Sequence, residues 1–271
     1  MKATPVQLGE GFRIAPPMFT SEHDPARWRY RGPFSQLAGA IIVQIRTDQG
    51  IVGYGLRGGG GAAAYIIEKH VSDPLVSANP LNVESLWDQM YSSSLLHGRR
   101  LVVMAMSGID LALWDIAGKH AGKPVYRLLG GAVKDRVPVY YTGLVERGLK
   151  LGIKSFKMAA GVGVRDGRDG MRLLESRLRE ARKTIGPDAE LMIDCICSWD
   201  VPYTLEMAER LAEVRLAFIE EPLTADDIDG YADLCRRVRG TRIASGEHEY
   251  TRFGFQLLLK HNAVHILQPD V

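Results

Sequence analysis

The stretch Leu191-Met-Ile-Asp-Cys-Ile-Cys197 decides the fold, because it is a short apolar run that carries a single acid, Asp194. Two further apolar runs follow along the chain, and they end in Glu220 and Glu247. The interval from Asp194 to Glu220 nearly equals the interval from Glu220 to Glu247, and each is about the length of one strand-plus-helix unit. Because parallel strands end together, the three acids should gather at one end of a sheet or barrel, where they could hold a hard cation.

The second half of the chain shows the same alternation of strands and helices on both sides of this stretch. Short apolar runs predict strands at residues 137–142, 153–159, 191–197, 216–220, 241–247 and 264–268, with helical patterns at 145–151, 171–185, 204–214, 228–238 and 254–261. This order implies a parallel sheet with right-handed crossovers. Acids on three consecutive strands favour a TIM-type (β/α) barrel, because a doubly wound sheet gathers its site at one switch point.

The first half has a different rhythm, which indicates a separate domain. Two apolar runs at residues 39–46 and 51–56 flank a turn, so they predict a β-hairpin, and helical patterns follow at 62–71, 83–91 and 102–120. We therefore expect an α+β domain at residues 1–130 and a barrel domain at residues 131–271. Residues 1–35 show no sustained periodicity and predict a loop. Its basic side chains, Arg31 among them, either face solvent or meet an anionic substrate.

Composition excludes several classes of function. The 271 residues are 46% hydrophobic and 24% charged, and the formal net charge is +2. These values are ordinary for a globular protein and do not indicate a nucleic-acid or anionic-membrane partner. Neither a signal sequence nor an uninterrupted apolar run long enough to span a bilayer is evident, so we expect a cytoplasmic protein.

The three cysteines, Cys195, Cys197 and Cys235, do not indicate a disulfide framework. Cys195 and Cys197 would share one face of the predicted strand, opposite Asp194, because side chains alternate along a strand. We interpret them as buried packing residues rather than zinc ligands, because a structural zinc site needs four ligands.

The motifs Ile219-Glu-Glu-Pro222, Ser245-Gly-Glu-His248 and Leu267-Gln-Pro-Asp-Val271 resemble those of the enolase superfamily. The motifs Asp110-Leu-Ala-Leu-Trp-Asp-Ile-Ala-Gly118 and Lys123-Pro-Val-Tyr-Arg-Leu-Leu-Gly-Gly131 resemble those of its mandelate racemase/muconate lactonizing branch. Within that branch, Tyr140-Tyr-Thr-Gly143, Lys157-Met158 and Gly246-Glu-His248 are most similar to the L-rhamnonate dehydratases.

This resemblance implies a capping domain in front of a modified (β/α) barrel, and a magnesium-dependent chemistry. Asp194, Glu220 and Glu247 match the three Mg²⁺ ligands, whereas Glu221 matches an acid that is not usually a ligand. The implied function is an acid-sugar dehydratase, a hydro-lyase. It abstracts the proton α to a carboxylate through a metal-stabilised enediolate and then eliminates water, giving a 2-keto-3-deoxy acid.

The resemblance also assigns roles to residues outside the metal site. Many relatives carry Lys-x-Lys where this chain has Lys157-Met-Ala159, so Lys157 is a candidate catalytic residue while the second lysine is replaced. Asp270 matches an acid that orients a general base on the following strand. Arg31 and His248 are the candidate substrate-binding residues. A sugar acid is the implied substrate, and a homo-oligomer is the expected assembly.

The predicted barrel is apparently truncated after the sixth strand. On that basis we expect the chain as given to be inactive or crippled in catalysis, since strands seven and eight would supply the general base. Two alternatives stay open: a racemase or cycloisomerase of the same superfamily, and a non-catalytic remnant that binds metal. A barrel whose acids are purely structural is the remaining interpretation.

Overall fold

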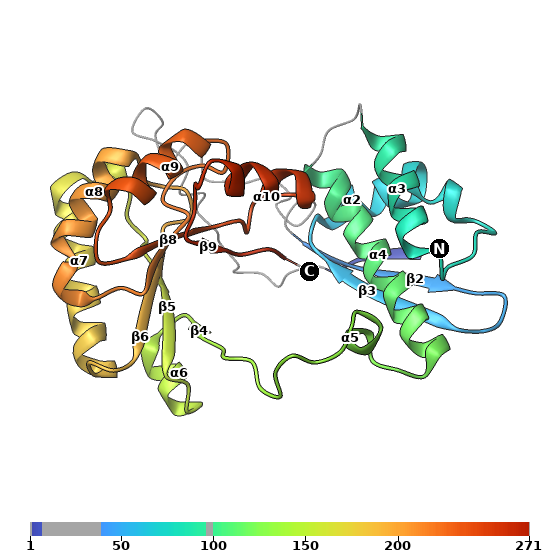
Figure 1. Ribbon diagram of the computed structural model, residues 1–271, viewed down its shortest axis with the longest axis horizontal. Helices are drawn as coiled ribbons and strands as arrows, with labels where there is room; N and C mark the ends of the chain where they lie inside the picture. Colours follow the sequence, from blue (N-terminus) through green and yellow to red (C-terminus); the bar gives the residue numbers. More distant parts are fainter. Residues whose placement is uncertain (1, 7–38, 96–99, 271) are drawn as a thin grey trace. The chain divides into compact units, whose positions relative to one another are not determined.

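The computed structural model describes residues 2–6, 39–95 and 100–270, with the backbone alone for 2–6. The described residues fall into two compact units, and the division between them lies between Arg136 and Val137 (Figure 1). The domain boundary predicted near residue 130 stays a prediction. Each unit has its own sheet and its own hydrophobic core.

The first unit is built on a three-stranded antiparallel sheet in the order β1-β2-β3. The predicted hairpin is present as β2 (Ala40–Arg46) and β3 (Val52–Arg57). The prediction of a loop for residues 1–35 is wrong at its start, because β1 (Lys2–Val6) pairs with β2. A five-residue strand that contains a proline shows too little alternation to be recognised from its sequence alone.

Helices complete the first unit, and the long helix α4 packs on the sheet. Its predicted apolar face is buried, with Met106, Ile109, Leu113 and Ile116 in the core. The helical segments of this unit are α2 (Gly60–Ile66), the π-helix η1 (Ile67–Val71), the 3₁₀ turn η2 (Asp73–Leu75), α3 (Val83–Ser94), α4 (Arg100–Ala121) and α5 (Val125–Leu128).

Glycines let α4 approach strand β3 closely. A Cβ atom on Gly55 would lie 2.0 Å from the carbonyl oxygen of Gly108, and one on Gly53 would lie 2.1 Å from that of Ala112. No side chain fits at such distances, so the sequence Gly-Tyr-Gly in β3 is a condition for this packing.

Among the described residues, one helix is long and apolar enough to cross a membrane, although no such segment is expected from the sequence. This helix is α4, and half of its apolar stretch is buried inside the first unit. Buried core helices have the same length and composition, so this property is weak evidence for a membrane span.

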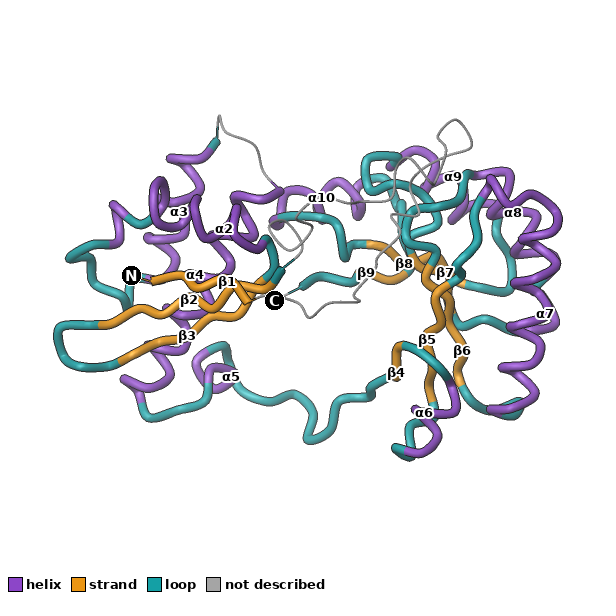
Figure 2. Tube along the Cα trace, turned by 180° about the vertical axis from the view of Figure 1, so that it is seen from behind, coloured by secondary structure: helices purple, strands orange, loops and turns teal. Residues whose placement is uncertain are grey.

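The second unit is a parallel sheet in the order β4-β5-β6-β7-β8-β9, with helices between successive strands. It forms part of a (β/α) barrel, as the alternating pattern predicts. In Figure 2, helices α7 and α8 lie on one side of strands β5 and β6. The strands are β4 (Tyr141–Thr142), β5 (Ser155–Ala159), β6 (Glu190–Asp194), β7 (Phe218–Glu220), β8 (Arg242–Ser245) and β9 (Ile266–Leu267). The helical segments are α6 (Val145–Lys150), η3 (Val164–Asp166), α7 (Gly167–Ile185), α8 (Val201–Arg210), η4 (Ala212–Val214), α9 (Ile228–Arg237) and α10 (Thr251–Lys260).

Two predicted strands are shorter than expected. The strand predicted at 137–142 is reduced to β4. Pro138 has no N–H to donate to a neighbouring strand, and residues 137–140, which precede β4, are exposed. The strand predicted through Cys197 ends at Asp194, because Ile196 and Cys197 have left-handed backbone conformations. The expectation that Cys195 and Cys197 alternate with Asp194 along one strand is therefore wrong.

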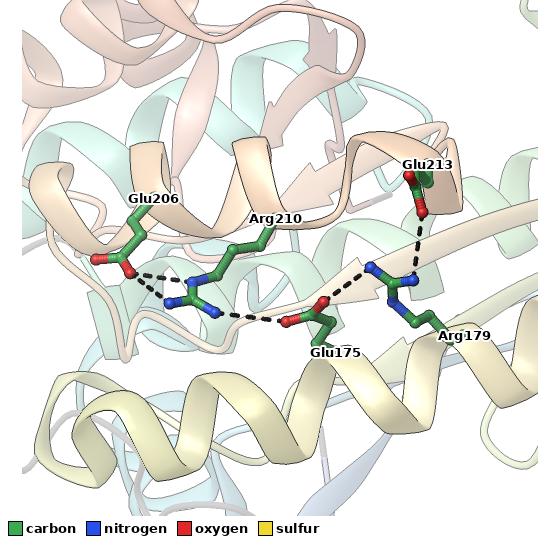
Figure 3. Close-up of polar contacts among 5 residues, drawn as sticks. All are labelled: Glu175, Arg179, Glu206, Arg210 and Glu213. Atoms are coloured by element: carbon green, nitrogen blue, oxygen red, sulfur yellow. Dashed lines mark hydrogen bonds and ion pairs between the residues drawn. The ribbon is translucent and has the colours of Figure 1, made fainter.

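The outer helices of the second unit are joined by an ion-pair network (Figure 3). Arg210 on α8 contacts Glu206 on the same helix and Glu175 on α7, with nitrogen–oxygen distances of 2.9 Å and 3.5 Å. Arg179 on α7 contacts Glu175 at 2.9 Å and Glu213 at 3.3 Å. Ion pairs at or near the surface contribute little individually, so the network links the two helices without adding much to the stability of the unit.

Candidate metal centre

Three acids lie together at the carboxyl ends of three neighbouring strands. Asp194 ends β6, Glu220 ends β7, and Glu247 lies two residues beyond β8. Asp194 and Glu220 are direct partners in the sheet register. One carboxylate oxygen from each acid lies within 4.8 Å of the other two. The structure thus brings together the acids that the sequence interval singled out.

Lys157 balances part of this negative charge. Its Nζ lies 2.6 Å from Glu220 Oε1 and 3.5 Å from Asp194 Oδ2, and the side chain is buried. Burial lowers the pKa of Lys157, but the hydrogen bond and the charges of Glu220 and Asp194 outweigh this effect and raise it overall. The amine is therefore protonated at neutral pH and acts here as a cation rather than as a base.

One carboxylate oxygen of Glu220 remains available to bind a cation. Burial raises the pKa of Glu220 to about 6, although the hydrogen bond from Lys157 opposes the shift. Its Oε2 is buried and accepts no hydrogen bond from the described residues. The Gln268 amide lies near enough to lower the pKa, but it makes no hydrogen bond of good geometry to that oxygen.

An unpartnered buried carboxylate oxygen is costly unless a cation meets it. Three carboxylates also form an all-oxygen donor set, which suits a hard divalent cation such as Mg²⁺ better than a soft one. Because Glu247 is exposed, the cluster opens toward solvent and leaves room for further ligands. The residues present therefore fit a divalent metal ion.

Backbone hydrogen bonds hold the loops beyond the strands in place. The N–H of Cys195 donates to the Glu220 carbonyl at 2.8 Å, and the N–H of Cys197 donates to the Glu221 carbonyl at 2.7 Å. Cys197 and Glu221 have positive φ angles of 57° and 39°, which non-glycine residues rarely adopt. Such conformations persist only where surrounding structure fixes them, and they concentrate at functional sites.

Glu221 and His248 form a second polar group beside the three acids. His248 Nδ1 lies 2.5 Å from Glu221 Oε2, and the backbone N–H of His248 donates to Glu221 Oε1 at 3.1 Å. Burial raises the pKa of Glu221, but the hydrogen bonds and charge of His248 outweigh burial and lower it overall. The same hydrogen bond is the main cause that raises the pKa of His248. Cys197 Sγ lies 3.6 Å from Glu221 Oε2 and completes the group.

The described part of the chain contains one further predicted site residue, Asp270. Asp270 lies three residues beyond β9, is exposed, and belongs to neither cluster found among the described residues. Ala159, which replaces the second lysine, is the sheet partner of Asp194 and lies at the level of the metal ligands. Arg31 lies outside the described residues.

Sequence reasoning missed the group of Cys197, Glu221 and His248. Cys195 is buried in the core, as the packing interpretation expects, but Cys197 turns toward Glu221. The acid doublet Glu220-Glu221 and the pair Glu247-His248 were visible signals, since each places a second polar side chain next to a predicted ligand. Cys197, Glu221 and His248 come together because the backbone at Cys197 is left-handed, and no sequence pattern predicts that conformation.

A (β/α) barrel segment with three convergent carboxylates at its strand ends defines a class, the barrel proteins with a divalent-metal centre. Residues 142–271 match the family described as "Enolase C-terminal domain-like", and residues 28–130 match the "Mandelate racemase / muconate lactonizing enzyme, N-terminal domain". The chain belongs to the enolase superfamily, in the mandelate racemase/muconate lactonizing branch.

Three of the similar proteins are named as rhamnonate dehydratases. The chain is 42% identical over 236 residues to the L-rhamnonate dehydratase of Saccharopolyspora erythraea, covering 86% of this chain and 60% of that protein. The structure of L-rhamnonate dehydratase from Gibberella zeae matches with a TM-score of 0.87 at 35% identity, over 96% of this chain and 66% of that one. A rhamnonate dehydratase structure from the same organism, complexed with Mg, matches with a TM-score of 0.85 at 33% identity, over 95% and 63%. The chain thus spans less than two thirds of the length of each of these relatives.

Proposed function

We propose that this chain carries the metal site of a Mg²⁺-dependent acid-sugar dehydratase with a substrate like L-rhamnonate. The observation that carries the proposal is the convergence of Asp194, Glu220 and Glu247 within 4.8 Å at three consecutive strand ends. It is supported by similarity to L-rhamnonate dehydratases and to a structure of one complexed with Mg. We further propose a cytoplasmic location and a homo-oligomeric state for the protein.

The proposed ligands are the three acids, each through one carboxylate oxygen. Bound Mg²⁺ would supply Lewis-acid stabilisation of the negative charge that develops when the proton α to the substrate carboxylate leaves. Glu220 is the most strongly fixed of the three, because it is fully buried and hydrogen-bonded to Lys157. Asp194 is oriented by the hydrogen bond that its Oδ1 accepts from the N–H of Ile196 at 2.9 Å.

The proposed role of Lys157 is to neutralise charge in the site. Its Nζ already bonds Glu220 and its pKa is raised, so it is poorly suited to accept the substrate proton. His248 is proposed to contact the sugar acid, with Glu221 holding its imidazole in place through Nδ1. Asp270 and Arg31 keep their proposed roles in orienting a general base and binding substrate, which rest on the resemblance.

A product assay tests this function. The 271-residue chain is incubated with Mg²⁺ and a panel of aldonic acids that includes L-rhamnonate, and 2-keto acid formation is measured, with Glu220→Gln as the inactive control. We expect Mg²⁺-dependent product from L-rhamnonate in the parent and none in Glu220→Gln, because Glu220 is the fully buried member of the proposed ligand set. Product from L-rhamnonate that forms equally well without Mg²⁺, or equally well in Glu220→Gln, would contradict the proposed function.

The same reaction run in D₂O distinguishes the alternatives. Exchange of the α-hydrogen without loss of water would support a racemase or cycloisomerase of the same superfamily. Magnesium binding with neither exchange nor product would support a chain that binds metal without catalysis. Failure to bind magnesium at all would rule out the dehydratase assignment.

A further inference from the structure

A second cluster of metal-ligating side chains lies next to the three acids and shares no residue with them. Cys197, Glu221 and His248 each offer one atom, and these atoms lie within 4.8 Å of one another. Each comes from the same strand-end loop as one of the three acids, since Cys197 follows Asp194, Glu221 follows Glu220, and His248 follows Glu247. The strand ends therefore present two triads of different chemistry.

The donor atoms of the second triad differ from those of the first in softness. Sulfur, imidazole nitrogen and one carboxylate oxygen suit Zn²⁺, whereas Mg²⁺ prefers oxygen ligands alone. Three protein ligands with one open position are typical of zinc sites that keep a water molecule. The need for four ligands, which excludes a structural zinc site at Cys195 and Cys197, does not apply to a site with three protein ligands and one open position.

One distance within the triad already matches a tetrahedral zinc site, and a second is shorter than such a site requires. With zinc–sulfur and zinc–oxygen bonds of about 2.3 Å and 2.0 Å, neighbouring sulfur and oxygen ligands stand about 3.5 Å apart. Cys197 Sγ and Glu221 Oε2 are 3.6 Å apart. His248 Nδ1 is 2.5 Å from Glu221 Oε2, where a bound cation needs about 3.3 Å. The imidazole must therefore shift by less than about 1 Å, and its side chain is 51% exposed.

Burial and backbone geometry fix the other two ligands. Glu221 and Cys197 are only 1% and 8% exposed, and the N–H of Cys197 is hydrogen-bonded to the carbonyl of Glu221. Burial and the charge of Glu221 raise the pKa of Cys197 to about 12, so the free thiol holds its proton. A bound zinc ion would displace the thiol proton to solvent.

We propose that Cys197, Glu221 and His248 form a binding site for a borderline-soft divalent cation, Zn²⁺ in particular, separate from the three-acid site. The inference does not rest on the proposed function. It has a consequence for that function, because zinc would draw the imidazole of His248 away from a sugar acid.

Cobalt titration tests the site, because Co²⁺ substitutes for Zn²⁺ and gives an absorption band when a thiolate binds it. The 271-residue chain is titrated with Co²⁺ in excess Mg²⁺, and Zn²⁺ is then added. We expect a thiolate-to-cobalt band that saturates at an equimolar amount and disappears on addition of Zn²⁺. Glu247→Gln should retain the band, because Glu247 is not one of the three ligands of the second triad.

Three variants test whether Cys197 and His248 are ligands. Cys197→Ser should abolish the band, while Cys235→Ser, the matched control at the third cysteine, should keep it. His248→Gln should lower zinc affinity by about 10- to 100-fold and, being exposed, keeps the test decisive if Cys197→Ser does not fold. Absence of the band in the parent, or an unchanged zinc affinity in His248→Gln, would overturn the proposal.

Discussion

Lys157 is the residue on which the charge balance of the three-acid site depends. It lies 2.6 Å from Glu220 Oε1, and without it two carboxylates would face each other with no cation. We expect Lys157→Met to lower the free energy of unfolding by roughly 2–4 kcal/mol without metal, since a buried charge loses its partner. Magnesium should restore more stability in this variant than in the parent, because it replaces the missing positive charge.

Urea unfolding with and without Mg²⁺ measures both effects. Lys154→Met, at an exposed lysine just before β5, is the matched control and should behave like the parent. An equal gain from Mg²⁺ in the two variants would show that Lys157 and the metal do not share the same carboxylates.

Asp110 on α4 makes the stability of the first unit depend on pH. Burial, and then the charge of Glu84, raises its pKa from 3.8 to about 6. The folded chain therefore holds this proton more tightly than the unfolded chain does, so stability falls as pH rises from about 4 to about 6. We expect Asp110→Asn to stabilise the protein by about 1–2 kcal/mol at pH 7 and hardly at all at pH 4.

Thermal unfolding at the two pH values checks this prediction. Glu84→Gln removes only the smaller of the two causes, so it should act in the same direction with a smaller size. A loss of stability in Asp110→Asn at pH 7 would contradict the assigned cause of the shift.

At the scale of elements, the contact between α4 and β3 is the most demanding part of the first unit. A Cβ atom at Gly55 would meet the backbone of α4 at 2.0 Å, and neither element can yield without disturbing the core. We expect Gly55→Ala to destabilise the protein by about 3 kcal/mol or more. Gly58→Ala, next to the same strand with nothing within 4 Å of the added atom, should change stability by less than about 1 kcal/mol. Chemical denaturation of both variants provides the measurement, and equal losses would mean that the close approach is not what matters.

Some elements could be predicted from the sequence and others could not, for physical reasons. The apolar face of α4 and the runs that end in Asp194 and Glu220 follow from periodicity, because burial selects side chains at fixed spacing. Strand β1 and the turn at Cys197 were missed, since strand pairing and left-handed backbone depend on contacts made by distant residues. The strand at 137–142 is shorter than its apolar run predicts, because Pro138 interrupts the hydrogen bonding that a continuous strand needs.

At the scale of the whole molecule, the candidate site was predictable as a set of acids but not as a pair of triads. Asp194, Glu220 and Glu247 stand out because equal intervals along the chain become neighbouring positions in a parallel sheet. The group of Cys197, Glu221 and His248 depends on loop geometry beyond the strand ends. The spacing of residues along the chain does not predict that geometry.

The central claim is that the three acids bind a divalent metal ion, and magnesium binding measured by calorimetry tests it most directly. Glu247→Gln removes the exposed ligand without leaving Lys157 unpaired, and Glu249→Gln alters an acid in the same loop that belongs to neither cluster. We predict that Glu247→Gln weakens Mg²⁺ binding by at least about tenfold, whereas Glu249→Gln leaves it nearly unchanged. Binding that is equally strong in the parent and in Glu247→Gln, or no binding to the parent at all, would contradict the account.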